Sequence, residues 1–202
     1  MNYVDRYQNR EIMIVEKWIN NIRGLKDIVK FVNKANTGFH DVRVGFIDNR
    51  ADLIIEVKED EFYWYNRTGN LGFDYISAFT YNNDNIRNFA QQNNLWIKPS
   101  SIAYFLDNIT IHKMGKLVTC DADIQLFYVE NKGEVILLNA YFNSLLQAYL
   151  PNIQQQYSMR INNKKIYDSR NDTWESSAYF INPNQDQKLK ELLINDINKL
   201  FN

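Results

Sequence analysis

The sequence predicts a mixed α/β (α+β) fold in which a central mixed β-sheet is flanked by helices. Three observations predict it: apolar residues recur at helical spacing in residues 5–22, alternate at strand spacing in residues 41–58, and form two runs around a turn at residues 131–133. Helices that precede and follow groups of strands are typical of such a domain. A chain of 202 residues fits one domain, residues 1–202, with a full core.

Composition excludes several classes of protein. Hydrophobic residues make up 45% of the chain and aromatic residues 14%, which excludes a disordered protein. The one cysteine, Cys120, excludes an internal disulfide and a multi-cysteine zinc site, and fits a reducing, cytoplasmic setting. No apolar run reaches the roughly 18 residues that cross a bilayer, and the first residues lack the apolar centre of a signal peptide, so no membrane partner is expected.

Charge gives only a local indication of a nucleic-acid partner. The net charge is −1, without the basic excess typical of nucleic-acid-binding domains. Acidic residues at a metal site would offset a basic surface, so a local patch matters more than the sum. The candidates for such a patch, which could equally be scattered solvated side chains, are Lys113, Lys116, Arg160, Lys164 and Lys165.

The first element is predicted to be a helix over residues 5–22. Ile12, Val15 and Ile19 lie three or four residues apart, the spacing of a stripe that faces a core. Gly24 fits the position just after the helix. Residues 25–33 are predicted to continue it briefly, before a loop.

A β-hairpin follows. Apolar residues alternate with polar or small ones over residues 41–47 and again over residues 52–58, the period of half-buried strands. Residues 48–51 between them are polar and of types that hydrogen-bond their own backbone, which predicts the turn.

The hairpin places two acids and a lysine on one face. A two-residue loop sets Asp41 opposite Glu56, and a four-residue loop sets Asp41 opposite Lys58. Directly opposed side chains lie about 5 Å apart, so all three converge in either register. A slip of one residue would separate them.

The remaining elements are read from the same patterns. The predicted strands are residues 62–65 (an aromatic fragment after the acidic turn 59–61), 71–80, and 117–129 and 134–142 (a hairpin around Gly133). Residues 152–180 give no single pattern, and strands at 157–161 and 177–181 around a polar loop are one interpretation. The predicted helices are residues 83–93, 100–106, 143–149 (ending before Pro151) and a last helix from Asn184 or Asp186 to Leu200. Asp121 and Asp123 are expected to be outward-facing charges.

Two carboxylates on one hairpin face predict a divalent cation. Asp41 and Glu56 would repel each other unless a positive charge lay between them. Mg²⁺, or Mn²⁺, takes one or two carboxylates together with phosphate and water. The ammonium of Lys58 would point into the same space, where it could hold an attacking water or stabilise negative charge on phosphate. These groups together suit phosphodiester hydrolysis.

The same residues resemble the PD-(D/E)XK nuclease superfamily, which includes restriction endonucleases, Holliday-junction resolvases and phage recombination nucleases. Asp41, followed by Glu56-Val57-Lys58 at the end of an apolar strand, is similar to its motif, although His40 stands where the motif has proline. The resemblance implies a restriction-endonuclease-like core, metal binding by Asp41 and Glu56, and a lysine, Lys58, that assists the water. It also implies a metal-site glutamate on the first helix, for which Glu11 is the candidate; a surface glutamate is the alternative.

The resemblance extends over residues 38–80. The turn Thr68-Gly69-Asn70 and the acid Asp74 after it look like a segment of phage-type members. Asp52 is a rival for the first acid, but it precedes Glu56 on the same strand by about 13 Å, too far to share one metal.

The (D/E)xK triplet alone has little specificity, because the chain contains three: Glu56-Val57-Lys58, Glu130-Asn131-Lys132 and Asp186-Gln187-Lys188. Only the first lies on an apolar strand with an acid on the facing limb. The sequence thus predicts a Mg²⁺-dependent DNA endonuclease of restriction or phage and mobile-element type, which could act as a homodimer. The alternative is a module without catalysis that binds nucleic acid or protein.

Overall fold

The chain divides into two compact units, each described here by itself. The structure, a computed structural model, describes residues 3–35, 41–48, 50–60, 63–167 and 173–201; among these it leaves out the side chains of residues 3–8, 41, 63, 163–167 and 173. The first unit comprises Met1–Arg67, Asp121–Leu145 and Gln187–Asn202, and the second comprises Thr68–Cys120 and Leu146–Asp186. The sequence predicted one domain, residues 1–202, whereas the chain packs into two compact units.

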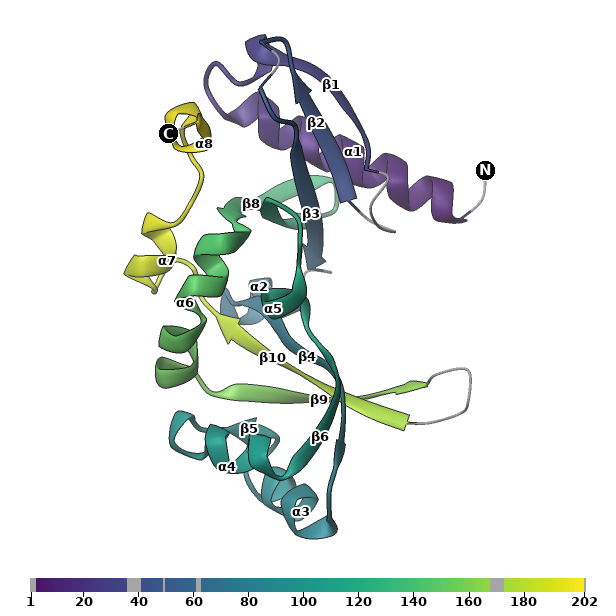
Figure 1. Ribbon diagram of the computed structural model, residues 1–202, viewed down its shortest axis with the longest axis vertical. Helices are drawn as coiled ribbons and strands as arrows, with labels where there is room; N and C mark the ends of the chain where they lie inside the picture. Colours follow the sequence, from purple (N-terminus) through teal and green to yellow (C-terminus); the bar gives the residue numbers. More distant parts are fainter. Residues whose placement is uncertain (1–2, 36–40, 49, 61–62, 168–172, 202) are drawn as a thin grey trace. The chain divides into compact units, whose positions relative to one another are not determined.

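Helices are interspersed with groups of strands along the chain (Figure 1). The helices are α1 (Tyr3–Asn21), η1 (Lys26–Ile28), α2 (Tyr63–Thr68), α3 (Asp84–Gln92), η2 (Pro99–Ser101), α4 (Ile102–Asp107), α5 (Lys116–Thr119), α6 (Asn143–Gln156), α7 (Gln187–Glu191) and α8 (Ile197–Phe201). The strands are β1 (Val29–Lys34), β2 (Asp41–Phe46), β3 (Leu53–Asp60), β4 (Leu71–Tyr81), β5 (Trp96–Ile97), β6 (Ile109–Met114), β7 (Ile124–Asn131), β8 (Glu134–Phe142), β9 (Met159–Tyr167) and β10 (Thr173–Ile181). The predicted mixture of helices and strands is confirmed.

The first unit is built on a five-stranded mixed sheet in the order β1-β2-β3-β7-β8. β2 pairs antiparallel with both β1 and β3, β3 and β7 are parallel, and β7 and β8 form an antiparallel hairpin. The hairpin turns at Lys132 and Gly133, whose φ angles of 48° and 88° are those of a tight turn that favours glycine.

Helix α1 covers one face of this sheet (Figure 1). Its side chains Val15, Trp18 and Ile19 are at most 4% exposed and belong to one apolar cluster with Ile55 of β3 and Leu126 of β7. The stripe predicted for residues 5–22 is therefore the packing surface of the helix. No helix in the described part of the chain is long and apolar enough to cross a membrane.

The second unit holds a separate antiparallel sheet in the order β5-β9-β10-β4-β6. Phe73 and Phe79 of β4 are at most 1% exposed, and Phe79 makes an edge-to-face contact with Phe105 of α4 at 5.7 Å between ring centroids. Asn83 caps α3 by accepting a hydrogen bond from the backbone N–H of Ile86.

The prediction for residues 25–33 was wrong, because Val29–Lys34 forms strand β1 instead of continuing the helix. Gly24 has a φ of +80°, which ends the helical path. The β-branched residues Val29 and Val32 then pair with Phe46 and Val44 of β2, so sheet pairing decides the conformation of this short segment.

The strand predicted for residues 62–65 was also wrong. Tyr63–Thr68 forms the short helix α2, although its aromatic residues favour strands. Gly69 follows the helix with a φ of +70°, the conformation of a glycine that ends a helix. Gly69, which was predicted to lie in a turn, therefore marks the end of a helix.

The helix expected to end before Pro151 continues through that residue as far as Gln156. Pro151 lies on the exposed side, where the loss of one N–H donor costs the helix least. Leu146 and Ile153, both 0% exposed, keep the opposite side of the helix packed.

The final helix is interrupted. Between α7 and α8 the chain pairs with the edge of the first unit's sheet, where Leu193 bridges Tyr141 and the N–H of Ile194 donates to the carbonyl of Ala140 at 2.8 Å. A helix cannot make these backbone bonds, so pairing with β8 prevails over helical spacing.

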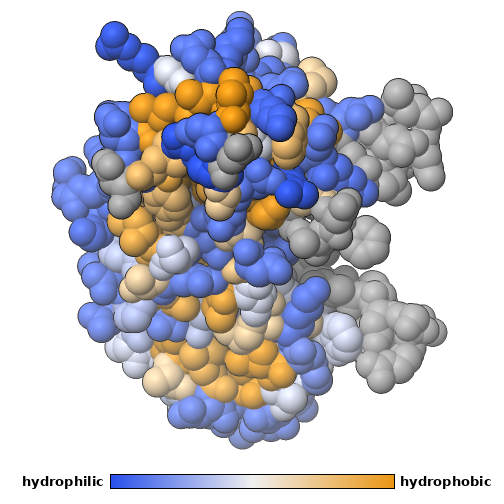
Figure 2. All heavy atoms as spheres, turned by 45° about the horizontal axis from the view of Figure 1, so that its top comes forward, coloured by the Kyte–Doolittle hydropathy of each residue, from blue (hydrophilic) through white to orange (hydrophobic). Residues whose placement is uncertain are grey.

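Exposed apolar side chains are found in both units. On the face seen in Figure 2 they gather in patches within a mostly hydrophilic surface. The large hydrophobic residues that are most exposed in the described chain are Met13, Ile47, Tyr104, Ile111, Val135, Ile136 and Leu145.

Candidate functional site

The pairing of β2 and β3 sets Asp41 directly opposite Glu56. This is the register expected for the two-residue loop, and it continues as far as Val44 opposite Leu53. Because side chains alternate along a strand and Ile55 and Val57 pack in the cluster with α1, Glu56 lies on the opposite face of the sheet. The side chain of Asp41 and all of His40 lie outside the described residues.

Glu56 and Lys58 form an ion pair on this face. The Glu56 side chain is 5% exposed, and its Oε1 lies 3.1 Å from Nζ of Lys58, whose side chain is 23% exposed. A carboxylate that loses most of its water requires a compensating charge or hydrogen bonds. Lys58 supplies one such charge, which agrees with the prediction that the two side chains share a space.

A buried amide adjoins the pair. Gln125 of β7 is the parallel-strand partner of Glu56 and is 2% exposed. Its Nε2 donates to Oδ1 of Asn143 at 2.6 Å, and Asn143 is itself 5% exposed. Both residues were missed at the level of sequence. The available signal was a glutamine inside the otherwise apolar run Ile124–Val129, where a buried amide requires partners.

Asp123 fastens β3 beside β7. The backbone N–H of Ile54 donates to Oδ2 of Asp123 at 2.8 Å, and the N–H of Asp123 donates back to the carbonyl of Ile54 at 2.9 Å. Asp123 is exposed, as predicted, but its carboxylate also fixes the start of β3. This clamp lies two residues before both Glu56 and Gln125 and holds their register.

Glu11 is buried on the helix that packs against the other face of the sheet. It is 7% exposed and lies four residues before Val15, on the core-facing side of α1. Its burial does not fit a surface glutamate. The strand alternation puts Glu56 on the face away from this helix, so the two glutamates lie on opposite faces of the sheet.

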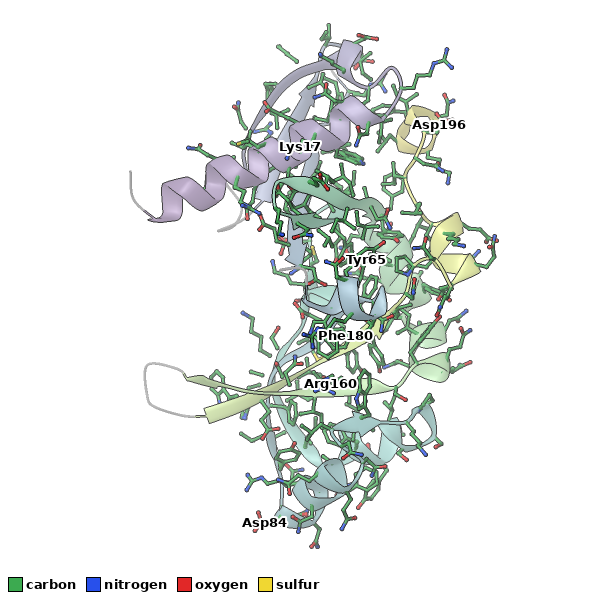
Figure 3. The ribbon with its side chains drawn as sticks, turned by 180° about the vertical axis from the view of Figure 1, so that it is seen from behind. Lys17, Tyr65, Asp84, Arg160, Phe180 and Asp196 are labelled. Carbon is green, nitrogen blue, oxygen red and sulfur yellow. The ribbon has the colours of Figure 1, made fainter. Side chains whose placement is uncertain are left out.

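The second (D/E)xK triplet has an acid in a structural network. Glu130 accepts hydrogen bonds from Arg10, at 3.3 Å, and from the hydroxyl of Tyr128. Burial, followed by the hydrogen bond to this carboxylate, raises the pKa of Tyr128. Lys17 of α1, labelled in Figure 3, lies 3.3 Å from the same hydroxyl, and Arg10 also pairs with Glu59 at 2.7 Å.

In the third triplet, the acid and the lysine each contact other residues. Asp186, 5% exposed, accepts hydrogen bonds from the hydroxyls of Tyr149 at 3.0 Å and Tyr157 at 2.7 Å. Lys188 pairs with Glu191 on α7 at 3.2 Å. Of the three triplets, only the first has its acid and lysine paired with each other in the described contacts.

The predicted basic patch falls in the second unit. Lys113 is exposed on β6, and the guanidinium of Arg160 lies 5.1 Å from the ring centroid of Trp96, a cation–π contact (Figure 3 labels Arg160). The side chains of Lys164 and Lys165 lie outside the described residues.

The donors on the Glu56 face suit a hard cation. Carboxylate and amide oxygens are the protein ligands that Mg²⁺ and Mn²⁺ prefer, and Glu56 and Gln125 offer both kinds within one buried face. Among the side chains that are described, which exclude that of Asp41, no three His, Cys, Asp or Glu residues are grouped as metal ligands.

Comparisons of the chain with protein-family models, with curated proteins and with solved structures gave no significant match.

Proposed function

We propose that this protein is a Mg²⁺-dependent deoxyribonuclease that cleaves phosphodiester bonds within DNA, with Asp41, Glu56 and Lys58 at its centre. The proposal depends above all on one observation. The strand ladder sets Asp41 opposite a Glu56 that is nearly buried and paired with Lys58 at 3.1 Å. An aspartate paired across the ladder with a buried glutamate, beside a lysine, suits a site for a cation that binds phosphate.

Each side chain has a distinct task in this reaction. Asp41 and Glu56 would hold the metal, which when bound polarises the phosphate and lowers the pKa of a coordinated water. Lys58, at 3.1 Å from Glu56, orients the attacking water and stabilises the negative charge that develops on phosphate. The water gives a proton to solvent as its oxygen bonds to phosphorus, and the leaving sugar oxygen takes a proton from solvent as its bond to phosphorus breaks.

The arrangement of the first unit supports a restriction-endonuclease-like core of the PD-(D/E)XK type. Its mixed sheet carries the proposed site on one face and helix α1 on the other. A cytoplasmic setting, a role in restriction or in phage and mobile-element recombination, and a homodimer that cuts both strands belong to the same proposal.

Cleavage assays test the proposal with plasmid, branched and single-stranded DNA, in the presence of Mg²⁺ or Mn²⁺ and with chelator. Wild-type protein is expected to cut only with metal, and Lys58→Ala to lose at least about 100-fold in rate, the usual scale for removing one group that stabilises developing charge. Lys188→Ala is the matched control, because Lys188 closes the third triplet but lies on an exposed helix.

The outcomes separate the two functions. Cutting that Lys58→Ala loses and Lys188→Ala keeps would establish the nuclease. Failure of the wild-type protein to cut any of these substrates with metal would overturn the nuclease proposal. The alternative, a non-catalytic binding module, would then be tested by binding assays with the same DNA substrates.

A further inference from the structure

Gln125 is a buried amide beside the proposed metal site. It lies in β7, paired with Glu56 of β3, and the two residues are 2% and 4% exposed. Paired residues of adjacent parallel strands point to the same face, so the Gln125 side chain shares the face of Glu56 and Lys58. An amide at this depth costs free energy unless its polar atoms have partners.

The hydrogen bond to Asn143 fixes the direction of this amide. Asn143 follows β8, which lies on the side of β7 away from β3. Its backbone N–H donates to the carbonyl of Asp123 at 2.9 Å, so its place is tied to the start of β7. This bond directs the donor end of the amide, Nε2, toward Asn143, and the oxygen is the other polar atom of the same planar amide.

We propose that Gln125 supplies its amide oxygen to the cation held by Asp41 and Glu56, and that Asn143 is the positioning residue that turns this oxygen toward the site. This inference rests on the proposed nuclease function. An amide is a neutral donor, so it adds a hard ligand without another negative charge next to Glu56, whose charge Lys58 already balances.

Metal binding without DNA tests the inference. Calorimetric titration of Mn²⁺ into the full chain compares wild type, Glu56→Gln, Gln125→Leu, Gln125→Glu and Asn143→Ala. Gln125→Leu is expected to raise the dissociation constant at least about tenfold, and Asn143→Ala to raise it by less, as for residues that orient metal ligands. Gln125→Glu keeps an oxygen and adds charge, so its affinity is expected to equal or exceed that of wild type.

The matched control is Gln147→Leu. Gln147 is another partly buried glutamine, in the second unit, whose Nε2 donates to the carbonyls of Val118 at 3.1 Å and Cys120 at 3.2 Å. It is expected to lose stability and keep wild-type metal affinity. Thermal unfolding of each variant establishes that the titrated protein is folded, and Asn143→Ala keeps the test decisive where Gln125→Leu does not fold.

Failure of the inference and failure of the proposed function give different results. If Glu56→Gln loses Mn²⁺ affinity while Gln125→Leu and Asn143→Ala keep it, Gln125 is a structural residue and the inference alone is overturned. If the wild-type chain binds no Mn²⁺, the proposed function falls, and the inference falls with it.

Discussion

The pair of Glu56 and Lys58 has consequences for stability that do not depend on its function. Nζ and Oε1 are 3.1 Å apart, and the glutamate side chain is 5% exposed. Removing one partner of a buried pair leaves the other charge without its counter-charge, which costs more than the pair itself contributes. The neutral isostere glutamine at position 56 has no such requirement.

A double-mutant cycle in metal-free buffer measures this coupling. Lys58→Ala is expected to lower the free energy of unfolding, and the same substitution in a Glu56→Gln background to lower it by about 1–3 kcal/mol less. Urea unfolding of the four proteins gives the coupling energy. Equal losses in both backgrounds would show that groups other than Lys58 compensate Glu56.

At the scale of elements, Asp186 joins helix α6 to the chain that follows β10. Tyr149 lies on α6 and Tyr157 just after it, and both hydroxyls donate to the Asp186 carboxylate. Burial, followed by this hydrogen bond, raises the pKa of Tyr149 to about 12, from an ordinary value of 10.0. The neutral phenol is therefore favoured in the folded protein.

This raised pKa predicts how stability depends on alkaline pH. The contribution of Tyr149 is fully present below pH 10.0 and is lost as the pH rises toward about 12, because the unfolded chain ionises first. Wild type is thus expected to lose more stability over this interval than Tyr149→Phe. Urea midpoints at several pH values measure it, with Tyr104→Phe, an exposed tyrosine of the same unit, as the control.

The sequence predicted the site residues that lie close together in the chain, but not those that lie far from them in the chain. Asp41 and Glu56 lie on strands joined by a short turn, so alternation predicted one shared face in either of two registers, and the structure has the register of the two-residue loop. Gln125 reaches Glu56 through parallel pairing of β3 and β7, which are separated in sequence by the whole of β4, β5 and β6. No local sequence pattern predicts which distant strand pairs in parallel with β3, because parallel strands are joined by long connections. Gln125 and Asn143 could therefore not be assigned to the site from the sequence.

The division into two units was equally hidden, because each unit is assembled from segments that are separated in sequence by parts of the other. The first takes three segments and the second takes two, and helix α6 runs through the boundary between Leu145 and Leu146. If the second unit unfolded alone, its two segments would become long loops within the first unit. Closing these loops has an entropic cost, which grows slowly with loop length. It would also require α6 to break after its first residues.

We therefore expect the two units to unfold together. Phe79, 0% exposed in the second unit, offers the test: Phe79→Ala is expected to cost about 3–5 kcal/mol through the cavity it leaves. Hydrogen exchange followed by mass spectrometry should then show protection lost equally in β4 and in β7, which belongs to the first unit. Faster exchange confined to the second unit would instead show two independently stable domains, and Ile55→Ala in β3 should then affect only the first.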